Sequence, residues 1–375
     1  MNPQERQPIR ILHVVGAMNM GGTETMLMNI YRKLDKRQMQ FDFVSYSGQE
    51  AYYDHEIERM GGKVFRLPNP QSAIALYKVM KSRGPYAAVH AHTLFHCGIA
   101  IAASALAGVP VRIAHAHTTL DKRDNKLRQM YFGTMRALLN RLSTHRLACS
   151  REAGNYLFGR RNRGRGFSHF PNVIDYSVFL EKNETEVNAF KEKENLNQGI
   201  VIGHIGRFVE AKNHVFLLEV MKRIVRKGAN AKLLLVGDGD FKPRIQKIAE
   251  EEGLSGDIRF VGLRDDIGTM LHAMDVFAFP STYEGLGLVL LEAQAGGLPC
   301  IVSEAIQPEA DVGMGLITRV PLAAGADAWA DAIIEKAGRR EKNAVKIIDA
   351  FERNRYSIPT GIAELIHIYE RRGCV

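Results

Sequence analysis

Short apolar runs alternate with helical segments along almost the whole chain, and no other feature of the sequence constrains the fold as much. The runs are rich in β-branched residues and are bounded by glycine, proline or polar residues, as buried strands are. In the first half, the expected strands are residues 9–15, 41–46, 64–67, 87–90, 111–114, 146–149 and 166–170. Helical segments between them, such as 72–82 and 97–107, complete the pattern of a parallel sheet covered by helices on both faces.

The same alternation begins again after a polar, charged stretch at residues 183–198, whose composition is typical of a linker. The expected strands of the second half are residues 200–205, 232–236, 259–262, 276–279 and 299–302. A chain of 375 residues is too long for one ordinary core. We therefore predict an α/β fold with two Rossmann-like, doubly wound parallel-sheet domains facing across a cleft. The predicted domains are residues 1–182 and 183–355, and a helix at 356–375 is expected to pack back on the first domain.

Residues 279–303 (FPSTYEGLGLVLLEAQAGGLPCIVS) combine a strand end, a glycine loop, an apolar helical segment and a second strand. The free backbone N–H groups and the positive dipole end of such a helix suit an anionic ligand. Glu284 precedes the helix and Glu292 lies within it. Because carboxylates repel phosphate, we expect both to accept hydrogen bonds from sugar hydroxyls. The alternative is a surface loop with a solvated glutamate, which the four glycines around the two acids disfavour.

Arg207 and Lys212, in the loop GRFVEAK, follow the first strand of the second half and precede a helix. In parallel sheets, ligands bind beyond the carboxyl ends of the strands. A guanidinium and an ammonium group there would neutralise a diphosphate and stabilise the charge that builds on it as it leaves. Basic residues are common in loops, so the indication depends on Glu284 and Glu292 belonging to the same half.

Gly16, Gly21 and Gly22 follow the first strand, but their spacing differs from the dinucleotide fingerprint G-x-G-x-x-G. No acidic residue ends the strand 41–46 at the usual place for a ribose contact. Both observations disfavour an NAD site and a dehydrogenase. The glycines fit either a close approach of backbone to a ligand or an ordinary tight turn.

The triplet Asp238-Gly239-Asp240 resembles the D-x-D sequence that holds a divalent metal on sugar nucleotides in an unrelated transferase architecture. Here the triplet lies in the second of two sheets and directly before a helix. We therefore expect Asp240 to be a helix N-cap and Asp238 a turn residue.

Histidines follow two neighbouring strands of the first half, as the pairs His90 and His92, and His115 and His117. Two His-x-His pairs are compatible with a metal site, but no acidic residue lies near either pair in the sequence. We favour a contact between one or more of these histidines and the substrate, and we expect no metal ligand among them.

The four cysteines are scattered without a Cys-x-x-Cys pair, which argues for a reducing compartment and against a disulfide framework or a structural zinc site. Residues 1–10 contain no signal-peptide core. No stretch provides the roughly 18–20 uninterrupted apolar residues of a membrane span. We therefore expect a cytoplasmic protein, placed at the inner face of the cell membrane if its basic surface binds lipid.

The net charge of +9 suits polyanionic, anionic-lipid or phosphorylated partners. Basic residues concentrate in Arg160–Arg165 (RRNRGR) and in the partly amphipathic stretch Lys122–Arg146. Two interpretations stay open, a solvated surface and attraction to an anionic bilayer. RNA binding is disfavoured because no stacking aromatics interleave with the basic run.

Segments spread over nearly the whole chain match one known family in sequence and in order. STYEGLGLVLLEAQAGGLPCIVS contains its two glutamates separated by seven residues, and GRFVEAKN matches its Gly-Arg…Lys loop. The other matching segments are LLLVGDGD, FVGLRDDI, FPNVIDYSVF, LACSREA and GGTETMLMNI. The chain therefore resembles glycosyltransferase family 4. GAMNMGGTE and AHAHTT are most similar to enzymes of bacterial exopolysaccharide and capsule synthesis. One departure is Asn172-Val173, where the family often has Asn-Gly, and it concerns the turn between the domains.

This resemblance implies a GT-B fold, an acceptor-side first domain, a nucleotide-sugar-binding second domain, and sugar transfer with retention and without a metal or other cofactor. By position, it implies that Arg207 and Lys212 bind the donor diphosphate. It also implies that Glu292 holds the ribose and Glu284 the transferred sugar, and that His117 is the active-site histidine. The further donor contacts that it implies are Gly22, Leu263, Arg264, Gly287, Leu288 and Val289.

We therefore expect a retaining hexosyltransferase that moves a sugar from a nucleotide-diphosphate sugar, with UDP as the favoured nucleotide, to a lipid-linked or oligosaccharide acceptor in exopolysaccharide or capsule synthesis. The expected partners are donor, acceptor and an anionic membrane face, without nucleic acid. A sugar-nucleotide epimerase of the same fold is one alternative, and it would convert the donor without an acceptor. A non-catalytic basic binding protein is another, and it would show no nucleotide-induced thermal shift.

Overall fold

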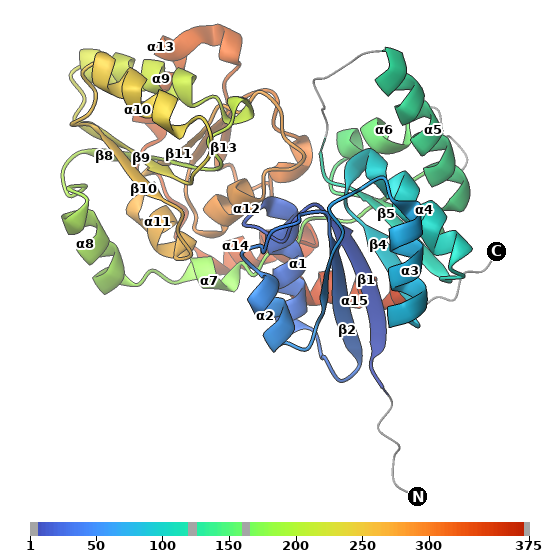
Figure 1. The fold of residues 1–375 in the computed structure, drawn as a ribbon. Helices are drawn as coiled ribbons and strands as arrows, with labels where there is room; N and C mark the ends of the chain where they lie inside the picture. The colour runs from blue at the N-terminus through green and yellow to red at the C-terminus, as the bar shows by residue number, and fades with distance from the viewer. Residues whose placement is uncertain (1–6, 119–125, 160–165, 371–375) are drawn as a thin grey trace, which may run out of the picture. The chain divides into compact units, whose positions relative to one another are not determined.

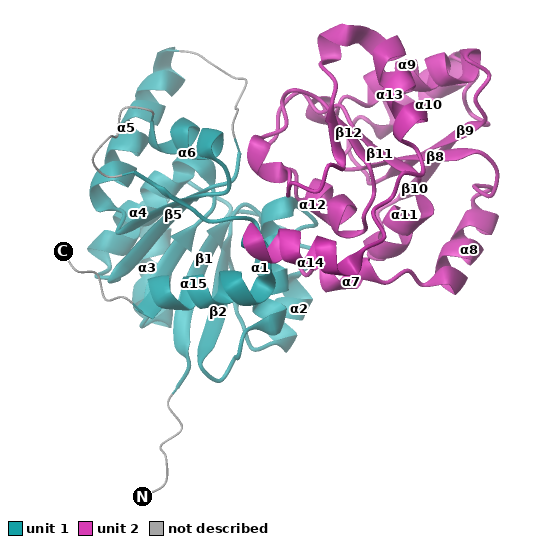
Figure 2. Ribbon diagram, turned by 180° about the vertical axis from the view of Figure 1, so that it is seen from behind, with its two compact units in different colours: residues 1–173, 355–375 teal, residues 174–354 magenta. Residues whose placement is uncertain are grey.

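The structure, a computed structural model, describes residues 7–118, 126–159 and 166–370. The chain divides into two compact units, residues 1–173 with 355–375 and residues 174–354 (Figure 2). Each unit contains one parallel sheet with helices against it (Figure 1), which confirms the predicted α/β class with two parallel-sheet domains. Within the described residues, no helix is both long and apolar enough to cross a membrane.

Unit 1 is built on a seven-stranded sheet in the order β3-β2-β1-β4-β5-β6-β7, with parallel pairing throughout. Its strands are β1 (Ile9–Val15), β2 (Met39–Ser45), β3 (Val64–Arg66), β4 (Ala88–Ala91), β5 (Val111–Ala116), β6 (His145–Ala148) and β7 (Ser168–His169). Its helices are α1 (Gly22–Lys33), α2 (Asp54–Arg59), α3 (Ala73–Arg83), the 3₁₀ helix η1 (Leu94–His96), α4 (Cys97–Leu106), α5 (Lys126–Leu142), α6 (Arg151–Phe158) and α15 (Ile358–Glu370). The strand order reverses direction between β1 and β4, the place where such sheets bind ligands.

The core of unit 1 is completed by the last helix of the chain. Helix α1 buries an apolar stripe that includes Leu27 and Tyr31, four residues apart, against strand residues such as Phe41. Helix α15 lies beside α1 and adds Leu365 and Tyr369 to the same cluster. Residues separated by most of the sequence therefore share one hydrophobic core.

Unit 2 contains a six-stranded sheet in the order β10-β9-β8-β11-β12-β13. Its strands are β8 (Ile200–Ile205), β9 (Ala231–Val236), β10 (Ile258–Gly262), β11 (Val276–Phe279), β12 (Cys300–Val302) and β13 (Ile317–Arg319). Its helices are α7 (Ser177–Leu180), α8 (Glu184–Lys193), η2 (Glu210–Lys212), α9 (His214–Arg226), α10 (Lys242–Glu251), α11 (Ile267–Ala273), α12 (Leu288–Ala295), η3 (Pro308–Ala310), η4 (Leu322–Ala324), α13 (Gly325–Lys336) and α14 (Ala344–Arg353). This order also reverses direction once, between β8 and β11.

The stretch 183–198 contains a helix, so its prediction as a linker is wrong. Asn183 caps α8, because its side chain accepts a hydrogen bond from the backbone N–H of Glu186. Val187 and Phe190 are buried, and α8 lies against α11. The charged residues between them form the solvent-facing side, which gave the segment its linker-like composition.

The units divide at residues 173/174 and 354/355, whereas the sequence placed domain boundaries at 182/183 and 355/356. The first difference comes from α7 and α8. Helix α7 lies against α11 and α12, so residues after 173 belong to the second unit.

Candidate active site

The N-terminus of α12 lies between β11 and β12, at the carboxyl edge of the unit 2 sheet. Gly287 is its N-cap residue with φ = +84°, a conformation that residues with side chains rarely adopt. A Cβ on Gly287 would also lie 3.1 Å from the Phe279 ring. No side chain caps the helix at this position, and the first N–H groups, including those of Leu288 and Val289, have no intrahelical acceptor. Local geometry therefore leaves these donors available to an anion.

Lys212 and Glu284, which the sequence assigned to two different parts of a donor, form an ion pair. Their Nζ and Oε1 atoms lie 2.6 Å apart, and the side chains are only 17% and 13% exposed. The ammonium group also lies 4.4 Å from the centroid of the Phe279 ring. Lys212 ends η2 after β8 and Glu284 follows β11, so the pair joins the loops of two adjacent strands.

Arg207 lies in the same loop as Lys212 but is exposed. The loop that contains Arg207 packs closely against Gly237. A Cβ on Gly237 would lie 2.1 Å from the carbonyl oxygen of Gly206. Gly237 has φ = +136°, so only glycine suits this close approach of the loops after β8 and β9. A rigid loop base with an exposed guanidinium group is suited to binding a phosphate.

The prediction that Asp240 caps α10 is wrong. The residue before the helix is Phe241, no side chain caps it, and Asp240 is exposed. Asp238 lies in the loop after β9, where its Oδ1 accepts from the N–H of Gly239 at 3.0 Å and lies 3.6 Å from Lys242 Nζ.

Glu292 lies in the second turn of α12, and its burial raises the pKa of the carboxyl group to about 7.

Leu263 and Arg264 follow β10, the edge strand of the sheet. Leu263 is exposed, and Arg264 pairs through two hydrogen bonds, of 2.8 and 2.6 Å, with the carboxylate of Asp266. Because all strands of this sheet are parallel, the residues that follow β8, β10 and β11 gather at one edge.

His204 and His214 also lie near Lys212, although sequence reasoning gave them no role. Burial, with a smaller contribution from the Lys212 cation, lowers the pKa of both imidazoles, that of His214 to about 4. His204 donates from Nδ1 to the backbone carbonyl oxygen of Ala278, 2.9 Å away. Both rings are therefore neutral at pH 7 and support the loop without adding charge.

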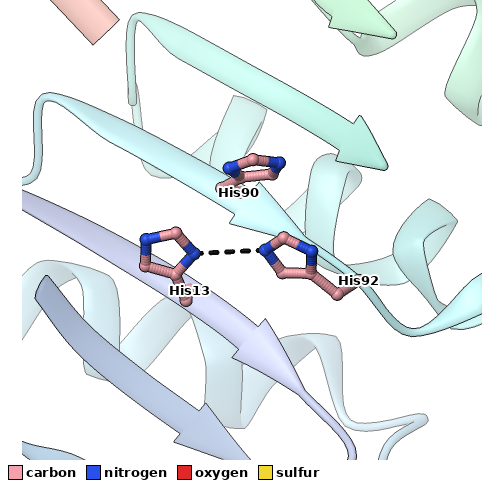
Figure 3. Close-up of side chains that lie close together, drawn as sticks. All are labelled: His13, His90 and His92. Atoms are coloured by element: carbon pink, nitrogen blue, oxygen red, sulfur yellow. Dashed lines mark hydrogen bonds between the residues drawn. The ribbon is translucent and has the colours of Figure 1, made fainter. Parts of the chain in front are cut away.

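In unit 1, the histidines gather at the carboxyl ends of the central strands, as the sequence predicted, but they lie deeper than expected. His90 and His115 belong to β4 and β5 and are buried, whereas His92 and His117 follow those strands. A fifth ring, His13 of β1, joins them (Figure 3). It was missed because one polar residue in an apolar strand gives no signal of its own. Gly22 starts α1 after the neighbouring strand β1.

Within the described part of the chain, two sets of three imidazoles have nitrogens within 4.8 Å of one another, His13 with His90 and His92, and His92 with His115 and His117. Neither set includes a carboxylate or thiolate. Several of these nitrogens already bond to each other, as between His92 and His117 at 2.9 Å. Hydrogen bonding thus explains the cluster, and the expectation of no metal stays a prediction.

The predicted basic surface is described only in part. Arg160–Arg165 and residues 122–125 lie outside the described residues. The rest of the stretch Lys122–Arg146 forms α5 and the start of β6.

Two family models match the chain, Glycosyltransferase Family 4 over residues 20–177 and Glycosyl transferases group 1 over residues 186–344. The putative glycosyltransferase EpsF of Bacillus subtilis (strain 168) is 38% identical to it, over 96% of this chain and 96% of EpsF. The chain belongs to glycosyltransferase family 4. The resemblance inferred from the sequence is thereby confirmed.

Other relatives have more specific names. The capsular polysaccharide biosynthesis glycosyltransferase CapH of Staphylococcus aureus is 29% identical over 76% of this chain and 78% of its own. The UDP-Gal:alpha-D-GlcNAc-diphosphoundecaprenol alpha-1,3-galactosyltransferase of Escherichia coli is 28% identical, over 63% of this chain and 62% of its own length. The structure of Anabaena HepE with UDP-glucose matches with a TM-score of 0.78 at 19% identity, over 96% of this chain and 98% of HepE. That likeness confirms the GT-B fold of this glycosyltransferase.

Proposed function

We propose that this glycosyltransferase moves a sugar from a UDP-sugar to a lipid-linked acceptor in exopolysaccharide synthesis, with retention of anomeric configuration. The observation that carries the proposal is the carboxyl edge of the unit 2 sheet. There, an uncapped helix N-terminus, the exposed Arg207 and the Lys212–Glu284 pair stand on adjacent loops. This edge combines groups for phosphate with a carboxylate for hydroxyl groups.

The Lys212–Glu284 pair suggests how the donor binds. A diphosphate competes for the Lys212 ammonium group, since two phosphates carry more charge than one carboxylate. As Lys212 turns to phosphate, the Glu284 carboxylate is released to accept hydrogen bonds from the transferred sugar. Arg207 and the N–H groups of Leu288 and Val289 complete the diphosphate site. Glu292 holds the ribose, and Leu263 and Arg264 lie beside the base.

The reaction then needs stabilisation of the leaving diphosphate more than a protein nucleophile. Arg207, Lys212 and the α12 N-terminus offset the charge as the bond between the sugar and the diphosphate breaks, so no metal is needed. The acceptor hydroxyl attacks the anomeric carbon on the same face, and its proton passes to the departing phosphate oxygen. Glu284 binds hydroxyl groups in this scheme and forms no covalent intermediate, the other route to retention.

Relatives support the choice of donor and acceptor. HepE was solved with UDP-glucose, and the Escherichia coli relative is named for UDP-Gal and a diphosphoundecaprenol-linked acceptor. CapH is named for capsular polysaccharide biosynthesis. A uridine nucleotide and an undecaprenyl-linked glycan are therefore the first substrates to test.

The deciding experiment incubates the full chain and a panel of UDP-sugars with undecaprenyl-diphosphate-linked sugars, in EDTA and followed by NMR. We expect a product with the donor's anomeric configuration. Donor conversion without acceptor would indicate an epimerase instead. An inverted product, or a requirement for added Mg²⁺ or Mn²⁺, would contradict the retaining, metal-independent scheme. Absence of any thermal shift with nucleotides would favour a binding protein.

Helix α5 supports contact of unit 1 with an anionic membrane. Its first turns expose Leu127 (76%) and Met130 (68%), and Lys126 and Arg128 flank them. Apolar residues beside cations are suited to the interface of an anionic bilayer. We expect L127E/M130E to reduce sedimentation with vesicles containing phosphatidylglycerol, and L106E, at an equally exposed leucine of α4 (77%), to leave it unchanged. Equal binding by all three proteins would contradict this surface.

A further inference from the structure

Five histidines of unit 1 lie on one face of three neighbouring strands: His13, His90, His92, His115 and His117. His13 and His90 are register partners on β1 and β4, and His92 follows two residues later on the same side. On β5, Ile113 is the register partner of His90, so His115 and His117 continue the same face beside β4. The topology thus brings the rings together at the point where the strand order reverses.

Three of these rings form a continuous hydrogen-bonded chain. Nδ1 of His13 lies 3.1 Å from Nε2 of His92 (Figure 3), and Nδ1 of His92 lies 2.9 Å from Nε2 of His117. Burial lowers the pKa of His13 and His117 to about 3 and that of His92 well below its usual value. All three rings are therefore neutral at pH 7.

Neutral rings leave this chain only two proton arrangements. A neutral imidazole has one N–H donor and one acceptor nitrogen. If His92 donates from Nδ1 to His117, its Nε2 must accept from His13, and every ring carries its proton on Nδ1. If the direction reverses, every ring carries its proton on Nε2. The tautomer of His117 is thus coupled to that of His13, two rings away.

The surroundings of the two ends favour the Nδ1 arrangement. Within the described residues, neither His13 Nε2 nor His117 Nδ1 has a hydrogen-bond partner that meets ordinary geometry, and both are buried. A proton on His13 Nε2 would place an unpaired N–H among the rings of Phe41 and Phe43, whose centroids lie 4.3 and 5.3 Å from the His13 centroid.

At the His117 end of the hydrogen-bonded chain, two effects act on the pKa of His117. Burial lowers it, and the smaller effect of the Asn172 side chain raises it. An amide oxygen that faces a proton on the ring has an effect of this sign. The Asn172 Oδ1 atom is itself buried without another partner in the described structure. It is therefore suited to accept from an Nδ1–H of His117.

We propose that the chain from His13 through His92 holds His117 in its Nδ1–H tautomer, so that the Nε2 lone pair accepts from His92 and His117 does not serve the transfer reaction as a base. The inference rests on the proposed function and on the family resemblance, which implies that His117 is the active-site histidine. It agrees with a scheme in which the acceptor's proton goes to the departing phosphate oxygen. His92, which touches no substrate, is a positioning residue.

A second chain in the same cluster provides the matched control. Tyr369 Oη lies 2.8 Å from His90 Nδ1, and His90 Nε2 lies 3.2 Å from His115 Nδ1. No hydrogen bond between described residues joins this chain to His117. Tyr369→Phe removes a buried hydroxyl beside the same rings and leaves the chain to His117 intact.

The first test is direct and needs no enzymatic activity. In the full-length protein labelled with ¹⁵N-histidine, long-range ¹H–¹⁵N correlation spectra distinguish a protonated from an unprotonated ring nitrogen. The signals that disappear in His117→Gln are assigned to His117. We expect a protonated Nδ1 and an unprotonated Nε2 on His117. The reverse pattern would overturn the proposal, even if no tested UDP-sugar is transferred and the proposed function itself fails.

The second test separates positioning from folding. His92→Phe keeps a ring but removes both nitrogens, and we expect kcat to fall about 10- to 100-fold with KM for the UDP-sugar changed less than about threefold. His92→Asn keeps a donor near the Nδ1 position and is expected to restore most of the loss. Tyr369→Phe should keep the wild-type kcat. A fully active, folded His92→Phe, or an equal loss in His92→Asn and His92→Phe, would overturn the proposal.

Discussion

The two sheets share one topology and differ in chemistry at the corresponding place. In each, the strand order reverses once, between β1 and β4 in unit 1 and between β8 and β11 in unit 2. At the reversal in unit 1 lie imidazoles that burial keeps neutral. The reversal in unit 2 carries the charged Lys212 and Glu284, with Arg207 exposed nearby.

This difference shows that topology determines where a site forms, and side chains determine what it does there. In each unit, the loops that follow the strands lie together at the carboxyl edge of that unit's own sheet. A charged edge attracts a diphosphate, whereas a neutral edge orients hydrogen bonds without competing for the phosphates. Four predictions test this comparison, and they are ordered from the largest expected effect to the smallest.

Removing the Lys212 cation tests whether charge defines the unit 2 edge. For Lys212→Met we expect kcat/KM to fall about 100- to 1,000-fold, since a cation would no longer offset charge on the leaving diphosphate. Steady-state transfer assays measure the effect. Lys232→Met is the control, because Lys232 also belongs to a partly buried ion pair, 2.8 Å from Asp257, but lies at the start of β9. Similar kinetics for both variants would refute the role of Lys212.

Neutralising Glu284 separates the sugar from the nucleotide. In Glu284→Gln, we expect kcat to fall about 100-fold and the Kd of UDP to stay within about threefold, because in the donor complex the carboxylate, released by Lys212, contacts the transferred sugar and no part of UDP. Transfer assays and calorimetric titration with UDP distinguish these effects. Asp257→Asn, in the control ion pair, should change neither quantity. A loss of UDP affinity equal to the loss of kcat would contradict the assignment.

Glu292 predicts a pH dependence of nucleotide binding. With the pKa of its carboxyl at about 7, the group is partly protonated in the free enzyme, and hydrogen bonds from ribose favour its ionised form. UDP binding should therefore release a proton near pH 7 and weaken as pH falls below 7, by at most about tenfold per pH unit. Calorimetry in buffers of different ionisation enthalpy measures the release.

The same raised pKa has an opposite consequence for the free protein. Because burial disfavours the ionised form, the contribution of Glu292 to stability is present at low pH and is lost as pH rises through about 7. Glu292→Gln should remove both dependences. Proton release that persists in Glu292→Gln would show that another group is responsible.

Gly287 gives the smallest expected effect. Alanine at φ = +84° costs about 1–2 kcal/mol of stability and places a methyl group beside the Phe279 ring. Urea unfolding of Gly287→Ala measures this cost. Gly296→Ala is the control at the other end of α12, where φ is −77° and the nearest atoms to an added Cβ lie at ordinary contact distance, 3.5 Å. Equal stability of the two variants would mean that the α12 loop is not conformationally constrained.

The sequence predicted the strands well because their signal is local. Apolar runs such as 200–205 and 276–279 match β8 and β11 without a shift. Composition misled where a helix has only a narrow buried stripe, as in α8, which buries Val187 and Phe190 among charged residues. Residues 317–319, the short strand β13, were not predicted, since three residues give no usable period.

At the sites, sequence reasoning located residues but not their partners. Strand ends predicted that Lys212 and Glu284 lie near a ligand, but residues 72 positions apart show no sign of an ion pair in sequence. The same applies to His13, which reads as one polar position in an apolar strand. Asp240 failed as an N-cap because α10 starts one residue later than an N-cap at Asp240 requires.

The position of α15 in the core of unit 1 has a consequence for synthesis of the protein. Residues 1–173 leave the ribosome before the roughly 180 residues of unit 2, which take about 10–40 s to translate at ordinary rates. During that interval, the apolar surface that α15 will cover, near Leu27 and Phe41, stays without its helix. An isolated fragment 1–173 should therefore aggregate, and the nascent first domain is expected to be a chaperone client until the final helix arrives.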